Sequence, residues 1–170
     1  MDYIKAVNDR AVAAVNDIKY EGEPSKEQFA VMNRKTKVTI DWHNVLPQPP
    51  ANNSDVTKKE LQILEQMTSS LTQRDIDLVM LVDEEPANVF LPILSDLGLS
   101  FPKEMYEKCK YQLDPIVLKL KFSYERPRPF QLAGVHNRVI KVVNTATHQT
   151  PAYPSGHVAQ AGICAALLSA

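Results

Sequence analysis

Pro154-Ser155-Gly156-His157 opens the last apolar run of the chain. Ser155 is a favoured helix N-cap, and residues 158–168 are mostly small or apolar with no proline, which predicts a helix. The free N–H groups of a first helical turn and the positive end of the helix dipole both favour an anion. Gly156 leaves room for a close approach, and His157 adds a donor that can be charged near neutrality. The segment therefore predicts a helix start that binds an anion.

A group of basic residues precedes this helix start. Lys121 is followed by Arg126-Pro127-Arg128-Pro129, and the two prolines stiffen the backbone that carries the arginines. Between residues 115 and 157 the chain has six Lys or Arg residues and one acid, Glu125. Ammonium groups, guanidinium forks and helix N-termini are the groups that bind phosphate in proteins. This region therefore predicts a phosphate site.

These motifs resemble a known superfamily. Lys-x6-Arg-Pro at Lys121, Arg128 and Pro129, followed by Pro-Ser-Gly-His at residues 154–157, is similar to its first two signature motifs. The superfamily joins type 2 phosphatidic acid phosphatases, bacterial class A acid phosphatases and vanadium-dependent haloperoxidases. The context of the two motifs resembles its soluble members, some of them encoded by bacteriophages. The resemblance covers roughly residues 114–170.

The resemblance implies a role for each motif residue. Lys121, Arg128, the Ser155 hydroxyl and the Gly156 N–H would bind phosphate oxygens and stabilise the transition state. His157 would be the general acid that protonates the leaving alkoxide. Two further residues, Arg126 and His148, are candidates for contacts around the site. No metal ligand is expected.

The third motif of the superfamily is not matched in this chain. In family members, Ser-Arg followed by a nucleophilic His and an Asp lies downstream of Pro-Ser-Gly-His. Here residues 165–170 continue the apolar run, with no glycine or basic last turn to end a helix. We therefore expect a helical bundle of the acid phosphatase/haloperoxidase type that is incomplete at its C-terminus, either as the front portion of a longer protein or as a truncated relative.

Three functional hypotheses follow. The first is a metal-independent phosphomonoester hydrolase acting on a phosphate-bearing small molecule, with no cofactor; in a variant of it, a vanadium-dependent haloperoxidase, the same residues hold vanadate. The second is a catalytically inactive relative that serves as a structural or interaction module of a larger assembly. The third is a helical domain whose motifs arise by chance.

Composition limits the class of protein and its partners. The 170 residues are 44% hydrophobic and 23% charged, which predicts a single globular domain. A net charge of −1 argues against nucleic acid as the main partner. The sequence has no signal-peptide core and no apolar stretch near 18 residues, so we expect no membrane span. The expected location is the cytoplasm or a soluble assembly, and a homo-oligomer or larger assembly is among the expected partners. Cys109 and Cys164 form no metal-binding or disulfide pattern, and we expect reduced thiols.

Capping signals and apolar periodicity predict an all-α helical bundle. The single domain would consist of N-terminal helices with a Pro-rich loop (1–54), a helical scaffold (55–113) and the phosphate-binding motifs (114–170). The expected boundaries are a helix over 3–19, helix starts at Ser25, Thr57, Thr72, Pro86, Ser100 and Asp114-Pro115, a C-terminal cap at Gly98 and a short strand at 139–143.

Overall fold

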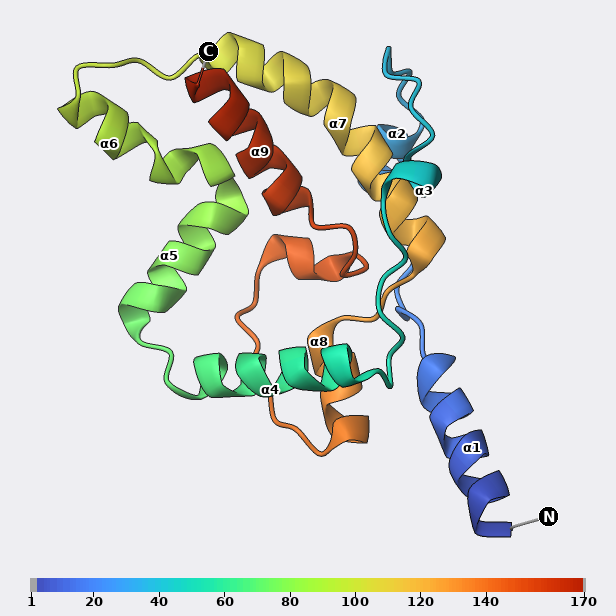
Figure 1. Cartoon of the computed structure of the whole chain (residues 1–170). Helices are drawn as coiled ribbons and strands as arrows, with labels where there is room; N and C mark the ends of the chain where they lie inside the picture. The colour runs from blue at the N-terminus through green and yellow to red at the C-terminus, as the bar shows by residue number, and fades with distance from the viewer. Residues whose placement is uncertain (1–2, 170) are drawn as a thin grey trace.

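The computed structural model describes residues 3–169, with side chains from residue 10, and every regular element in that range is helical (Figure 1). The predicted all-α class is therefore confirmed, while the acid phosphatase type of bundle stays a prediction. The elements are α1 (Tyr3–Asn16), α2 (Lys26–Met32), α3 (Trp42–Val45), α4 (Asp55–Ser69), α5 (Gln73–Glu84), α6 (Leu91–Asp96), α7 (Lys103–Tyr124), α8 (Pro129–Ala133) and α9 (Gly156–Leu168), with short 3-10 helices η1 (Pro86–Val89), η2 (Gly134–His136) and η3 (Ala146–Gln149).

The core lies where α9 packs against α7 and η1. Tyr106, Ala87 and Cys164 are buried there, and four partly buried apolar side chains surround them: Phe90, Phe101, Ile163 and Leu167. Figure 1 shows α9 between the long α7 and the α5–α6 arm, with α1 projecting from the body. The C-terminal end of α1 is held by buried Asn52, whose side-chain amide donates to the carbonyls of Val15 (3.0 Å) and Ile18 (2.7 Å).

Several predicted helix boundaries are confirmed by local hydrogen bonds. Ser25 and Thr72 cap α2 and α5, each through a reciprocal capping box with the residue three positions later. Gly98 follows α6 with a φ of +67°, the left-handed conformation that favours glycine. Pro86 opens a helical turn as predicted, although that turn is the 3-10 helix η1.

The helix start predicted at Asp114-Pro115 is wrong. α7 runs without a break from Lys103 to Tyr124 with Pro115 in its interior, where the missing N–H removes one helical hydrogen bond. Pro115 is fully buried, and the buried face of α7 continues across it from Tyr106 to Lys121. Burial along this face offsets the loss of one hydrogen bond and keeps the helix intact.

Two other boundaries were also wrong, each because a side chain outside the pattern satisfies the backbone. The cap of α4 is Ser54, whose hydroxyl accepts from the N–H of Thr57 at 3.2 Å, so the helix starts before Thr57. The strand predicted at 139–143 does not form. The Val139 and Lys141 N–H groups donate instead to side chains of α4, those of Glu65 and Thr68.

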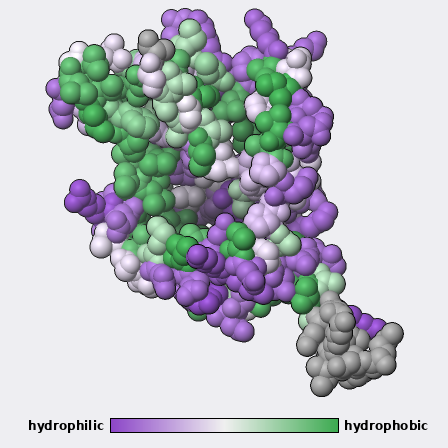
Figure 2. All heavy atoms as spheres, viewed as in Figure 1, coloured by the Kyte–Doolittle hydropathy of each residue, from purple (hydrophilic) through white to green (hydrophobic). Residues whose placement is uncertain are grey.

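Apolar side chains also lie on the surface. Figure 2 shows them gathered over the α5–α6 arm, where Leu78, Leu91, Ile93 and Leu97 are exposed. Among the described residues, no helix is both long and apolar enough to cross a membrane. A homo-oligomer or larger assembly stays a prediction.

Candidate anion-binding site

The five residues predicted to bind and protonate a phosphate ester line one cavity of about 330 Å³. Lys121 comes from α7, Arg128 from the segment before α8, and Ser155, Gly156 and His157 from the start of α9. α7 and α9 pack against each other, which brings these segments together. The convergence that the motifs predicted is therefore present in the fold.

Lys121 is buried at one side of this cavity, with only 7% of its surface exposed. Its Nζ donates to the carbonyl oxygen of Pro151 at 2.7 Å. Burial, together with the neighbouring positive charge of Arg128, lowers the pKa of Lys121 to about 7. A bound anion would favour the charged form of this amine and reverse that effect.

Arg128 is held by the loop that carries η3. Its Nε donates to the carbonyl of Thr150 at 2.5 Å, and its NH2 group donates to the Thr150 hydroxyl at 2.9 Å and to the carbonyl of Thr147. Burial lowers the pKa of Arg128 from its usual value, while electrostatic interactions with Tyr20 and Asp83 partly oppose this shift. The loop therefore fixes one side of the guanidinium and leaves NH1 without a hydrogen bond among the described residues.

Ser155 and Gly156 form the helix start. The Ser155 hydroxyl caps α9 by accepting from the N–H of Val158 at 3.3 Å. A Cβ atom on Gly156 would meet a Val117 methyl at 3.6 Å, an ordinary contact, so packing alone does not require glycine here. The space in front of Gly156 belongs to the cavity, which is consistent with a ligand approaching the backbone.

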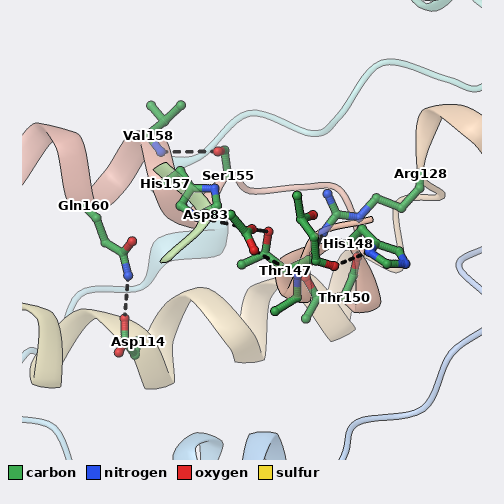
Figure 3. Close-up of polar contacts among 12 residues, drawn as sticks. Asp83, Asp114, Arg128, Thr147, His148, Thr150, Ser155, His157, Val158 and Gln160 are labelled. Atoms are coloured by element: carbon green, nitrogen blue, oxygen red, sulfur yellow. Dashed lines mark hydrogen bonds and ion pairs between the residues drawn. The ribbon is translucent and has the colours of Figure 1, made fainter. Parts of the chain in front are cut away.

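His157 faces a carboxylate that the sequence did not identify. Its Nε2 lies 4.0 Å from an oxygen of Asp83, at the end of α5, within ion-pair range when the imidazole is protonated (Figure 3). The side chain of Asp83 is only 8% exposed, and it accepts hydrogen bonds from the Ala146 N–H (2.8 Å) and the Thr147 hydroxyl. Because Thr147 also accepts from Arg128, Asp83 connects the histidine to the loop that orients the arginine.

Arg126 lies outside this cavity. Its guanidinium donates to Asn52 (2.6 Å), to the Thr57 hydroxyl (2.9 Å) and to the carbonyl of Pro50, and it lines a separate pocket beside α4. The residue ties the Pro-rich loop and the start of α4 to the segment that carries Arg128. Arg126 therefore supports the site indirectly, by holding the neighbouring backbone, and does not contact the cavity where a ligand would bind.

His148 and His136 also lie away from the cavity lining. His148 contacts the carbonyl of Thr145 through Nδ1 and packs edge-on against Phe130 with ring centroids 6.4 Å apart. His136 hydrogen-bonds the carbonyl of Asn52 at 2.9 Å. Within residues 3–169, His157 is the one histidine that lines the cavity, and no cluster of potential metal ligands is found there.

Several further polar residues line the cavity and were not identified from the sequence, among them Asp114 and Gln160. Asp114 on α7 accepts a hydrogen bond from the side-chain amide of Gln160 on α9, at 3.3 Å. The spacing of Asp114, Val117, Leu118 and Lys121 at i, i+3, i+4 and i+7 indicates one helix face, but Pro115 concealed the pattern by suggesting a helix boundary.

Comparisons of this chain with known protein families, with curated proteins and with solved structures gave no match. The resemblance to the phosphatase and haloperoxidase superfamily therefore stays a prediction. The chemistry of the site is argued below from its geometry.

Proposed function

We propose that this chain binds the phosphate group of a small molecule in the cavity between α7, η3 and α9, and that its function is metal-independent hydrolysis of a phosphomonoester. The observation that carries this proposal is the pairing of two buried or half-buried cations with a helix N-terminus. Among the described residues, neither Lys121 nor Arg128 has a carboxylate within salt-bridge distance. Cations withdrawn from water without a counter-charge favour binding of an anion.

The remaining groups suit phosphate ester chemistry. A phosphate between Lys121 and Arg128 would also lie near the N–H groups at the start of α9, which carry the positive end of the helix dipole. These donors would stabilise the charge of the transition state. As an attacking nucleophile forms the new bond to phosphorus, the P–O bond to the alcohol would break, and His157 would donate its proton to the departing alkoxide oxygen. Asp83 would orient the imidazole and stabilise its charged form.

A second candidate function is anion binding without catalysis. In-line displacement needs a nucleophile, and within residues 3–169 the cavity has no second histidine to serve as one. This observation favours the inactive structural or interaction module among the alternatives. The haloperoxidase variant would hold vanadate with the same donors, since vanadate resembles phosphate in tetrahedral shape and charge, and halide oxidation there would require a peroxide as the oxidant.

The test combines binding with turnover. We expect inorganic phosphate and vanadate to bind the chain, and Arg128→Ala and Ser155→Ala to weaken both by about 10-fold or more, since each change removes donors to an ionised ligand. Lys58→Ala is the control, because Lys58 pairs only with exposed Asp55 on α4. Equal affinities in all three variants would contradict the phosphate site.

Turnover distinguishes the two candidate functions. A chromogenic phosphomonoester should be hydrolysed in the presence of a chelator, with inhibition by vanadate and loss of activity in His157→Ala. Phosphate binding without hydrolysis by the chain would instead support the non-catalytic module.

A further inference from the structure

The anion cavity has a second polar end, formed by Asp114 and Gln160. Both side chains line the same cavity as Lys121 and Arg128. Figure 3 shows the Asp114–Gln160 pair and the Arg128–Thr150 group on opposite sides of His157. A ligand that fills the cavity would therefore meet cationic groups at one end and this pair at the other.

The separation of the two ends follows from the geometry of α7. Asp114 and Lys121 are seven residues apart on one helix face, which places their backbones about 10 Å apart along the axis. Val117 and Leu118 lie between them on that face and also line the cavity. The wall is thus cationic near Lys121, apolar in the middle and polar at Asp114, and a carbon skeleton fits the apolar stretch.

Asp114 has hydrogen-bonding capacity that the described protein does not use. Its one hydrogen bond is the 3.3 Å contact from Gln160 to Oδ1, so Oδ2 has no donor among the described residues. Burial raises the pKa of Asp114, as expected for a carboxyl group withdrawn from water. A carboxyl oxygen that has no donor from the protein can accept a hydrogen bond from a ligand group that enters the cavity.

We infer that the Asp114–Gln160 pair binds a hydroxyl group on the alcohol part of the substrate, so the substrate is the phosphomonoester of a hydroxylated alcohol whose hydroxyl lies several carbon atoms from the phosphate. This inference rests on the proposed phosphate site and names its substrate class. His157 lies between the two ends, where the bond between the phosphate and the alcohol would be placed. An unsubstituted alkyl phosphate would place its carbon chain along the apolar stretch and leave Oδ2 of Asp114 without a donor.

The experiment compares three probes by calorimetry on the 170-residue chain: inorganic phosphate, hexyl phosphate and 6-hydroxyhexyl phosphate. The two esters have the same carbon chain and differ only in the terminal hydroxyl. We expect the hydroxylated ester to bind about 10-fold or more tightly than hexyl phosphate, as for a hydrogen bond to a charged group. Asp114→Leu and Gln160→Leu should each remove this preference and leave the affinity for inorganic phosphate within about twofold.

Glu107→Leu is the matched control, because Glu107 is an exposed acid on α7 outside this cavity and should leave the preference intact. If Asp114→Leu does not fold, as judged by circular dichroism, Gln160→Leu on the other helix provides the same test. Equal binding of the two esters by the unmodified chain, or variants that weaken inorganic phosphate as much as the hydroxylated ester, would overturn this inference alone. Absence of inorganic phosphate binding would overturn both the inference and the proposed function.

Discussion

Replacement of Lys121 by methionine should raise the free energy of unfolding at low pH and leave it unchanged or lower it at high pH. Burial and then the charge of Arg128 lower the pKa of Lys121 to about 7 in the folded protein, whereas its value in the unfolded chain is near 10.5. Between these values the unfolded chain binds more protons, so the free energy of unfolding rises with pH across this window. Below pH 7 the amine is protonated in both states, and the full penalty of burying the charge remains.

The magnitude follows from these two pKa values. The buried charge lowers the free energy of unfolding by about 5 kcal/mol at pH 6 and by about 1 kcal/mol at pH 10. Methionine removes this penalty but also removes the 2.7 Å hydrogen bond to the carbonyl of Pro151, a loss of about 1 to 3 kcal/mol. At pH 6 the charge term is larger and the variant should be more stable, while at pH 10 the lost hydrogen bond offsets or exceeds the gain.

Urea unfolding followed by circular dichroism at pH 6 and pH 10 measures both terms. The difference in the free energy of unfolding between the two pH values should be about 4 kcal/mol larger in the unmodified chain than in Lys121→Met. Lys119→Met is the matched control, because Lys119 is exposed on the same helix and should leave the pH dependence unchanged. Parallel pH dependence of the unmodified chain and Lys121→Met would refute the assignment of a buried, partly neutral amine.

Three further predictions concern the charged groups around the site and the core. Sulfate, a dianion that does not titrate near pH 8, should bind with net uptake of protons, because Lys121 is mostly unprotonated above its pKa of about 7 and the anion favours its charged form. Calorimetry in buffers of different ionisation enthalpy measures this uptake, and Lys121→Met should remove it. Asp83→Asn should weaken sulfate binding by about 10-fold, because it loosens the η3 loop that orients Arg128. Asp77→Asn, on the exposed face of α5, is the control and should not weaken binding, and unchanged binding by Asp83→Asn would contradict the connecting role of Asp83. Glu85→Gln should lower the free energy of unfolding by about 2 kcal/mol, because Glu85 accepts hydrogen bonds from both Tyr106 and Lys110 beside the core. Glu84→Gln, at an exposed position, should leave stability unchanged, and equal denaturation midpoints for Glu85→Gln and the unmodified chain would contradict the prediction.

Helix boundaries were predictable where the responsible groups are close in sequence. The capping boxes at Ser25 and Thr72 and the left-handed Gly98 depend on hydrogen bonds and dihedral angles within a few residues. The strand predicted at 139–143 failed for the opposite reason. Its backbone donors pair with Glu65 and Thr68, residues of α4 that no local pattern connects to this segment.

The residues of the candidate site were likewise predictable from local sequence, whereas their surroundings were not. Lys121, Arg128, Ser155, Gly156 and His157 were predicted because an ammonium, a proline-flanked guanidinium and a capped helix start are each recognisable within a short stretch of sequence. Arg126 has the same local signature as Arg128, yet its hydrogen bonds go to the Pro-rich loop and α4. Neighbouring residues of one motif thus have different surroundings, which depend on the segments that pack against each of them.

The helical class, the positions of several helix ends and the cationic and helix-start groups suited to phosphate could all be inferred from the amino-acid sequence, since they depend on short-range sterics, capping and charge. The contact of Asp83 with His157, the pairing of Asp114 with Gln160 and the depressed pKa of Lys121 could not. Each arises from side chains far apart in the chain that meet only after α5, α7 and α9 have packed and excluded water. Burial then changes the charge state and the unused hydrogen-bonding capacity of these groups, and both properties depend on the packed environment.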